Sequence, residues 1–305
     1  THMITALRPL STSELLDRTF HLYRNNFVLF VAMFAIPQLF AFAVILTGAA
    51  LIVVKSETAL LTNVIGYLLL CLASFVSQAP IVLSISDNQM GQKIGVAGAF
   101  SRTKVSTLRV IWIMFLLFIA ISVFFGVVGL VIAVPLSALA QTASATIVGI
   151  ITSATIVIPL YVVVRSGLTL SLMIPATVVE GGWFLSSMRR SRALAKGNLF
   201  RIFTVSFLIS LLGVMVAFLL RLLVMMPAPF YGARDFARAQ AEYHVLQAVG
   251  IFVSISLVGP LATIALTLIY YDQRVRKEGF DLQLMMAALQ PGSAPPAAAA
   301  AAPNS

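Results

Sequence analysis

Few residues of the types that carry catalysis occur in this chain, and they lie far apart in its sequence. The histidines are His2, His21 and His244, and the single cysteine is Cys71. No HExxH, CxxC, GxSxG or P-loop pattern is present, so no grouping of metal ligands, of nucleophile and base, or of phosphate-binding glycines is evident. We therefore expect no enzymatic activity, no metal site and no cofactor.

Basic residues offer more chemistry, because they can hold anionic groups. The segment 188–196 reads MRRSRALAK and lies between two apolar runs. Each Lys or Arg beside an anionic membrane surface contributes about 1 kcal/mol of attraction, so the expected partners are membrane lipids, anionic on the cytoplasmic face. The sequence also leaves room for a protein partner. The residues predicted to bind the lipid are Arg189, Arg190, Arg192 and Lys196.

A further basic residue, Arg165, lies inside an apolar run. It precedes Glu180 by about 15 residues, which places it roughly 20 Å along a continuous helix. A cation at such a depth is a candidate functional residue that contacts a lipid phosphate or an anionic substrate. In the alternative interpretation the helix overhangs the membrane, and Arg165 extends to the surface or caps carbonyls of a neighbouring helix that proline has broken.

The elements that must position these residues are membrane-spanning helices. The mean hydropathy is +1.02, and 10% of the residues are charged, whereas soluble domains carry about 25% charged residues. We therefore predict an all-α polytopic membrane protein. A spanning helix needs about 20 mainly apolar residues. The runs that meet this requirement are 28–54, 60–86, 109–139, 146–178, 202–226 and 246–271.

The positions of Lys and Arg predict the orientation, because cytoplasmic segments collect these residues. They are frequent before the first run, in the second and fourth connections and after the last run. The outer connections hold Lys55 in the first, none in the third, and Arg234 and Arg238 in the fifth. Both termini are therefore expected in the cytoplasm. Nucleic-acid binding is not expected despite the net charge of +10, because the basic residues alternate with apolar runs instead of sharing a soluble face.

Four segments follow from this topology. Residues 1–27 are predicted to hold a cytoplasmic N-terminal amphipathic helix, and residues 28–271 form the six-helix transmembrane domain. Residues 272–289 are a cytoplasmic C-terminal segment that carries a sequence motif. Residues 290–305 are rich in Pro and Ala and are predicted to be a disordered tail.

The start of the first surface helix is well defined in the sequence. Ser11 and Glu14 fit a capping box, in which each side chain bonds to the backbone of the other residue. Leu16, Phe20 and Tyr23 then follow at helical spacing. This apolar stripe either lies in the membrane interface or packs on the inner end of the bundle.

A weak internal repeat relates the basic segments. The sequence GQKIGVAGAFSR, from Gly91 to Arg102, aligns with GGWFLSSMRRSR, from Gly181 to Arg192. The segment 10–26 aligns less well with both. The fold is therefore expected to contain as many as three repeated units, each an amphipathic helix followed by a helix pair.

Motifs near the two ends resemble those of a known family. LRPLS at 7–11 with ELLDR at 14–18, and YYD at 270–272 with RVRKEGFDL at 274–282, are similar to the ends of the bacterial membrane-domain family named after glycerophosphoryl diester phosphodiesterase. The resemblance implies a six-span protein of the bacterial cytoplasmic (inner) membrane. Some relatives add a soluble phosphodiesterase domain that carries catalytic His, Glu and Asp. The present 305 residues do not include such a domain, so the resemblance does not imply that this chain has the enzymatic activity.

The function expected on these grounds is that of a non-catalytic scaffold or lipid-interacting accessory subunit. The alternative is a transporter or flippase for a lipid or small amphiphile, which would use Arg165 and the spans that contain proline.

The two end motifs are also predicted to pair with each other, because both are cytoplasmic and both mix charge signs. Exposed ion pairs contribute about 0–1 kcal/mol each, so such a clasp would define geometry more than stability. The alternative is two separate solvated surfaces. The residues assigned to the clasp are Glu14, Asp17, Arg18, Asp272, Arg274, Arg276, Glu278 and Asp281.

Overall fold

The computed structural model describes residues 10–89, 95–139, 144–225 and 236–279. Asp281 and the tail 290–305 lie outside these ranges. The described residues are almost entirely helical, and six stretches among them are long and apolar enough to cross a membrane, which confirms the predicted all-α polytopic architecture. The helices are α1 (Thr12–Asn25), α2 (Phe27–Val53), α3 (Ala59–Gln89), α4 (Val96–Arg102), α5 (Lys104–Leu139), α6 (Ala145–Leu170), α7 (Met173–Glu180), α8 (Phe184–Ala195), α9 (Leu199–Met225) and α10 (Phe236–Glu278).

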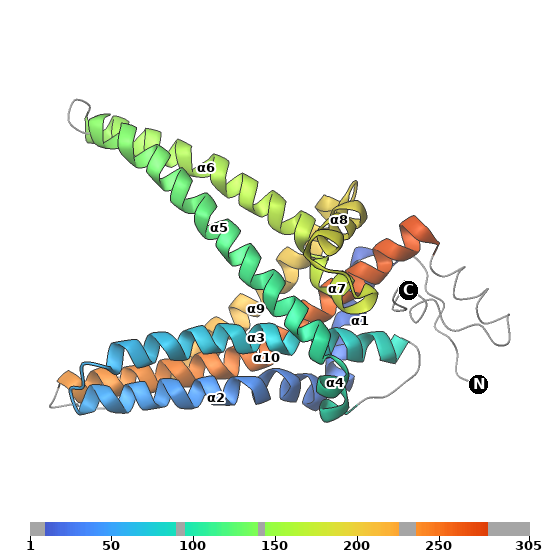
Figure 1. Cartoon of the computed structure of the whole chain (residues 1–305), viewed down its shortest axis with the longest axis horizontal. Coiled ribbons are helices and arrows are strands. Elements are labelled where there is room, and N and C mark those ends of the chain that lie inside the picture. The colour runs from blue at the N-terminus through green and yellow to red at the C-terminus, as the bar shows by residue number, and fades with distance from the viewer. Residues whose placement is uncertain (1–9, 90–94, 140–143, 226–235, 280–305) are drawn as a thin grey trace.

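The order of these elements has the threefold form expected from the sequence. The short helices α1, α4 and α8 each precede a pair of long helices. Together with α7 they gather at one end of the molecule (Figure 1), which we call the short-helix end. Both aligned arginines are exposed, but Arg102 pairs with Asp87 at 3.0 Å, whereas Arg192 makes no salt bridge with the described residues.

The predicted fourth run, 146–178, is not one helix. α6 ends at Leu170 and α7 begins at Met173. Pro175 explains the break, because it has no amide hydrogen for the Ser171 carbonyl four residues earlier, and its ring would collide with that carbonyl. Other prolines lie inside continuous helices: Pro37 in α2, Pro80 in α3, Pro159 in α6 and Pro260 in α10.

The packed core is built mainly from α2, α3 and α10, which run side by side (Figure 1). Glycines permit close approach at these contacts. A Cβ at Gly259 of α10 would lie 2.4 Å from Phe34 of α2, and one at Gly66 of α3 would lie 2.5 Å from Ile45 of α2. Small residues have this role in membrane bundles, where packing replaces the hydrophobic effect as the driving force between helices.

The α5–α6 hairpin diverges from this core (Figure 1), and we call it the arm. Val110 of α5 is buried against Val82 of α3 and Ile174 of α7, which fixes the base of the arm. Beyond that base, no residue from 114 to 132 is buried, although the stretch is apolar. The faces of the arm are therefore suited to contact with lipid chains.

The helix α1 begins at the capping box that the sequence predicts. The Glu14 amide donates to Ser11 Oγ at 3.2 Å, and the Ser11 amide donates to Glu14 Oε2 at 2.7 Å. Leu15 is fully buried, and the Tyr23 hydroxyl donates to the Leu257 carbonyl of α10 at 2.7 Å. α1 thus packs on the end of the bundle, while Phe20 stays exposed.

Candidate functional site

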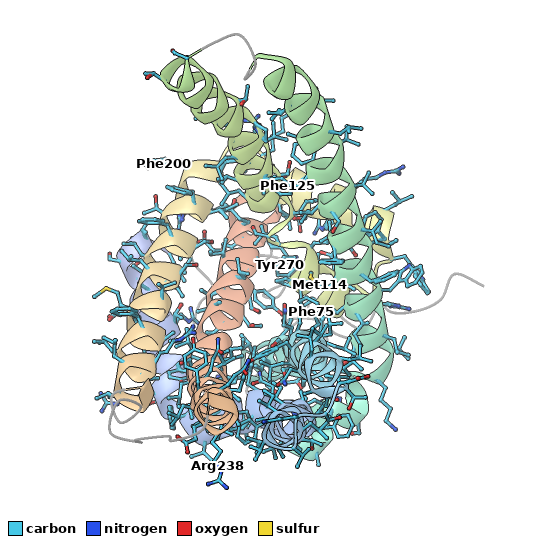
Figure 2. All side chains as sticks on the ribbon, turned by 90° about the vertical axis from the view of Figure 1, so that its left-hand side faces the viewer. Phe75, Met114, Phe125, Phe200, Arg238 and Tyr270 are labelled. Carbon is cyan, nitrogen blue, oxygen red and sulfur yellow. The ribbon has the colours of Figure 1, made fainter. Side chains whose placement is uncertain are left out.

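The last turns of α10 are the centre of the polar contacts at the short-helix end. Figure 2 views the molecule from the end opposite the short-helix end, and Tyr270 appears near the centre of that view, surrounded by the long helices. The neighbouring Tyr271 donates to Ser86 Oγ of α3 at 2.8 Å. Lys277 Nζ donates to the carbonyls of Ala193 and Lys196 at 2.7 and 2.6 Å, which caps the C-terminus of α8.

Asp272 holds the residue that precedes α1. Its Oδ1 accepts the Leu10 amide hydrogen at 2.8 Å, while its Oδ2 pairs with Arg201 of α9 at 3.2 Å and with Arg276 at 3.0 Å. Both arginines also donate to the Leu10 carbonyl. The carboxylate is fully buried, and its charge is compensated by these two guanidinium groups.

The two end segments therefore lie together, and Asp272 and Arg276 of the predicted clasp both bond to the backbone of Leu10. Asp272 bonds to the backbone of Leu10, while the Glu14 side chain caps α1. Asp17 is exposed. Arg18 is partly buried, and this burial lowers its pKa from the ordinary value.

Arg190 of α8 forms a second ion-paired centre. Its Nε donates to both carboxylate oxygens of Glu180 in α7 at 2.7 and 2.9 Å, and its Nη2 donates to Glu278 of α10 at 2.7 Å. Burial alone would lower the Arg190 pKa, but the hydrogen bonds and charges of Glu278 and Glu180 outweigh it and raise that pKa. The Tyr270 hydroxyl donates to Glu180 Oε1 at 2.6 Å, and Arg274 Nε lies 3.3 Å from Glu278.

The other predicted lipid-binding residues of α8 lie on a different face. Arg189, Arg192 and Lys196 are exposed and share one side of the helix, since they are three and four residues apart. We call these three residues the basic stripe. Within the described part of the chain the stripe makes no salt bridge. The opposite side of α8 packs on the protein, with Ser191 and Leu194 buried.

Arg165 lies much nearer the short-helix end than expected. The Thr169 carbonyl accepts from Ser191 Oγ of α8 at 2.7 Å, and Arg165 is four residues earlier, about 6 Å of helix rise. The prediction measured roughly 20 Å along a continuous helix as far as Glu180, whereas α6 ends at Leu170 and α7 begins at Met173. Arg165 is exposed, and its guanidinium lies 3.4 Å from the Tyr161 hydroxyl.

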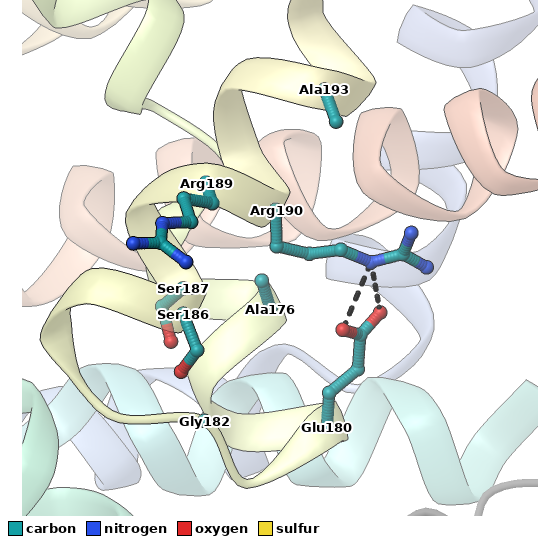
Figure 3. A pocket seen from close by; sticks show the side chains of 8 residues that line it. All are labelled: Ala176, Glu180, Gly182, Ser186, Ser187, Arg189, Arg190 and Ala193. Carbon is teal, nitrogen blue, oxygen red and sulfur yellow. Dashed lines mark hydrogen bonds and ion pairs between the residues drawn. The ribbon is translucent and has the colours of Figure 1, made fainter.

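A pocket of about 510 Å³ lies between α7 and α8 (Figure 3). Figure 3 shows Arg190 turned toward Glu180 and Arg189 on the other side, near the two serines. Arg165 is not among the residues that line it. Those residues are Ala176, Glu180, Gly182, Ser186, Ser187, Arg189, Arg190 and Ala193.

Arg109 of α5 positions the turn that leads into α8. It donates to the Gly181 carbonyl, and its guanidinium carbon lies 5.3 Å from the centre of the Trp183 ring, within cation–π range. Gly181 has a φ of +68° and ends α7, its amide donating to the Thr177 carbonyl at 3.0 Å. This left-handed conformation favours glycine at that position.

Several residues of the site were not among those predicted from the sequence, notably Glu180, Arg201 and Tyr270. Tyr270 is part of the YYD motif, which was the available signal for it. Glu180 and Arg201 stand in segments whose Lys and Arg content is explained by topology, and their partners Tyr270 and Asp272 are far away in the sequence. No local spacing could have identified those pairs.

Comparisons with protein-family models, curated proteins and solved structures found no match. Within the described ranges, no group of three or more His, Cys, Asp or Glu could hold a metal ion. The fold and the site define a multi-pass helical membrane protein with two ion-paired centres, one pocket and a basic stripe described at its short-helix end.

Proposed function

We propose that this protein is a non-catalytic membrane scaffold or lipid-interacting accessory subunit that binds anionic lipid headgroups through the basic stripe of α8. The observation that carries the proposal is that the basic residues of α8 have two different surroundings. Arg190 is occupied by Glu180 and Glu278, whereas Arg189, Arg192 and Lys196 are exposed on one face. Exposed cations aligned in this way suit a surface of negative charge.

The proposal places the short-helix end in the cytoplasm of a bacterial cell, with the spans in the inner membrane. The Lys and Arg bias supports this orientation. The resemblance of segments 7–18 and 270–282 to the bacterial membrane-domain family supports the location. That family assignment is likewise part of the proposal and rests on these end motifs.

Scaffolding fits the described geometry better than transport does. Transport was expected to use Arg165 and spans kinked by proline. Arg165 is exposed on α6, and the stretches around Pro37 and Pro260 pack in the core, where Phe34 and Ile264 are buried. The exposed arm offers apolar surface for lipid chains or for the spans of a partner subunit.

The test compares lipid preference in nanodiscs that contain phosphatidylglycerol and phosphatidylcholine. The variant Arg192→Gln/Lys196→Gln should reduce phosphatidylglycerol enrichment around the protein severalfold, since each removed charge contributes about 1 kcal/mol. The matched control is Arg24→Gln/Lys104→Gln, which removes two exposed cations from other helices. Equal enrichment for the two variants would contradict the proposal.

A further inference from the structure

The pocket between α7 and α8 is more selective in its chemistry than a charged surface. Both oxygens of its one carboxylate, Glu180, accept hydrogen bonds from Arg190, and Oε1 also accepts from Tyr270. The Arg190 guanidinium is also bonded to Glu278. Arg189 is therefore the lining cation left to attract a ligand, and the pocket favours an anion.

Two serine hydroxyls lie near the backbone of the same pocket. A Cβ at Gly182 would be 2.8 Å from both Ser186 Oγ and Ser187 Oγ, so a larger residue would displace these groups. The Ser187 hydroxyl is buried and lies 2.9 Å from Thr177 Oγ1. Thr177 gives its single hydroxyl hydrogen to the Met173 carbonyl at 2.7 Å, so the Ser187 hydrogen serves the contact with Thr177. The Ser186 hydroxyl likewise donates to the Trp183 carbonyl at 2.8 Å, so the two serines shape the pocket and Arg189 supplies the hydrogen-bond donors for a ligand.

The margins of the pocket are apolar and exposed. Trp183, the N-cap residue of α8, is 64% exposed, and Leu185 in the first turn of α8 is 58% exposed. They are chain neighbours of the lining residues Gly182 and Ser186. Tryptophan is enriched at the headgroup level of membranes, where its ring sits among the lipid headgroups. Ala176 and Ala193 complete the lining with small apolar surfaces that suit the carbon atoms next to an ester.

We infer that this pocket binds the phosphate ester of one phospholipid headgroup per chain, with Arg189 on the phosphate oxygens. Guanidinium groups bind phosphate through paired, charge-assisted hydrogen bonds. The inference rests on the proposed function, because it requires the short-helix end to face lipid headgroups. It adds a defined site of fixed stoichiometry to the diffuse attraction of the basic stripe.

The experiment is native mass spectrometry of the full chain after reconstitution with phosphatidylglycerol and transfer to mild detergent. One phospholipid should stay bound per chain, and Ser186→Leu should reduce its occupancy at least tenfold by filling the pocket without changing any charge. Ser101→Leu is the matched control. Ser101 is also an exposed serine of a short helix whose hydroxyl donates to the carbonyl three residues earlier, as Ser186 does. Equal occupancy in the two variants would overturn the inference.

Three further measurements test the inference. Arg189→Gln should also lose the bound lipid. This variant keeps the test valid if Ser186→Leu folds poorly. If Arg189→Gln retained the lipid, the site would be refuted. Arg192→Gln/Lys196→Gln should keep this one lipid even if nanodisc enrichment falls, so the pocket and the stripe are tested separately. Millimolar glycerol phosphate should not displace the lipid. Displacement would assign the pocket to a soluble phosphate ester and overturn the lipid assignment.

Discussion

Asp272 and Leu10 lie 262 positions apart in the sequence, and the Asp272 carboxylate accepts the Leu10 amide hydrogen at 2.8 Å. Arg201 and Arg276 bind the same carboxylate and also donate to the Leu10 carbonyl. The backbone of one residue is thus held from both sides by α9 and α10. This contact fixes where α1 begins on the end of the bundle.

Replacing Asp272 should therefore loosen the short-helix end. Asp272→Asn keeps a hydrogen-bond acceptor but leaves Arg201 and Arg276 without their carboxylate, and breaking a buried ion pair costs about 3–5 kcal/mol. We expect a marked fall in the thermal unfolding midpoint in detergent and faster hydrogen exchange in α1. The exposed Asp17 supplies the control, because Asp17→Asn should change neither quantity. Similar midpoints for both variants would show that the Leu10 contact does not order α1.

Arg189 and Arg190 should respond differently to the same substitution. Arg190→Gln leaves Glu180 and Glu278 without their shared cation, so the midpoint of thermal unfolding should fall by several degrees or more. Arg189→Gln should leave that midpoint nearly unchanged, because Arg189 is exposed. Thermal scans of the two purified variants in one detergent check this, and a larger fall for Arg189→Gln would refute the assignment of roles.

Glycine substitutions should separate the packed core from the arm. A Cβ at Gly259 would lie 2.4 Å from Phe34, so Gly259→Ala should destabilise the fold by about 1–3 kcal/mol through overpacking. Gly126 has no atom within 4 Å of such a Cβ, so Gly126→Ala should be neutral or slightly stabilising. Unfolding by graded denaturing detergent measures both. If adding Phe34→Leu restores the stability that Gly259→Ala loses, the collision lies at Phe34. If the stability is not restored, that contact is not the cause.

The orientation of the protein can be tested by cysteine labelling in intact bacterial cells. Cys71 is exposed and should first be replaced by serine. A cysteine at position 55, in the turn between α2 and α3, should then react with an impermeant maleimide from the periplasm. A cysteine at exposed position 192 should react only after the cells are opened. Labelling at 192 in intact cells without labelling at 55 would show that the proposed topology is inverted.

The number and type of the long helices were determined by local sequence. Residues 27–53 form one span because an uninterrupted apolar run cannot leave its backbone groups unpaired in lipid, and a helix satisfies them within the run. The start of α1 was equally local, because a capping box needs only Ser11 and Glu14. The break at Pro175 has a local cause too, but several other prolines do not break their helices. The sequence therefore indicated a kink without showing which proline would end a helix.

The site depended on the tertiary structure, because its ion pairs join residues far apart in the chain. Arg189 and Arg190 are neighbours of the same type, and the sequence assigned them the same role. A helix turns by about 100° between successive residues, so the two side chains leave α8 in different directions. Arg190 meets carboxylates from α7 and α10, whereas Arg189 remains exposed at the edge of the pocket. Which arginine is neutralised is decided by the acids that other helices bring within reach, and that depends on the packing of the whole chain.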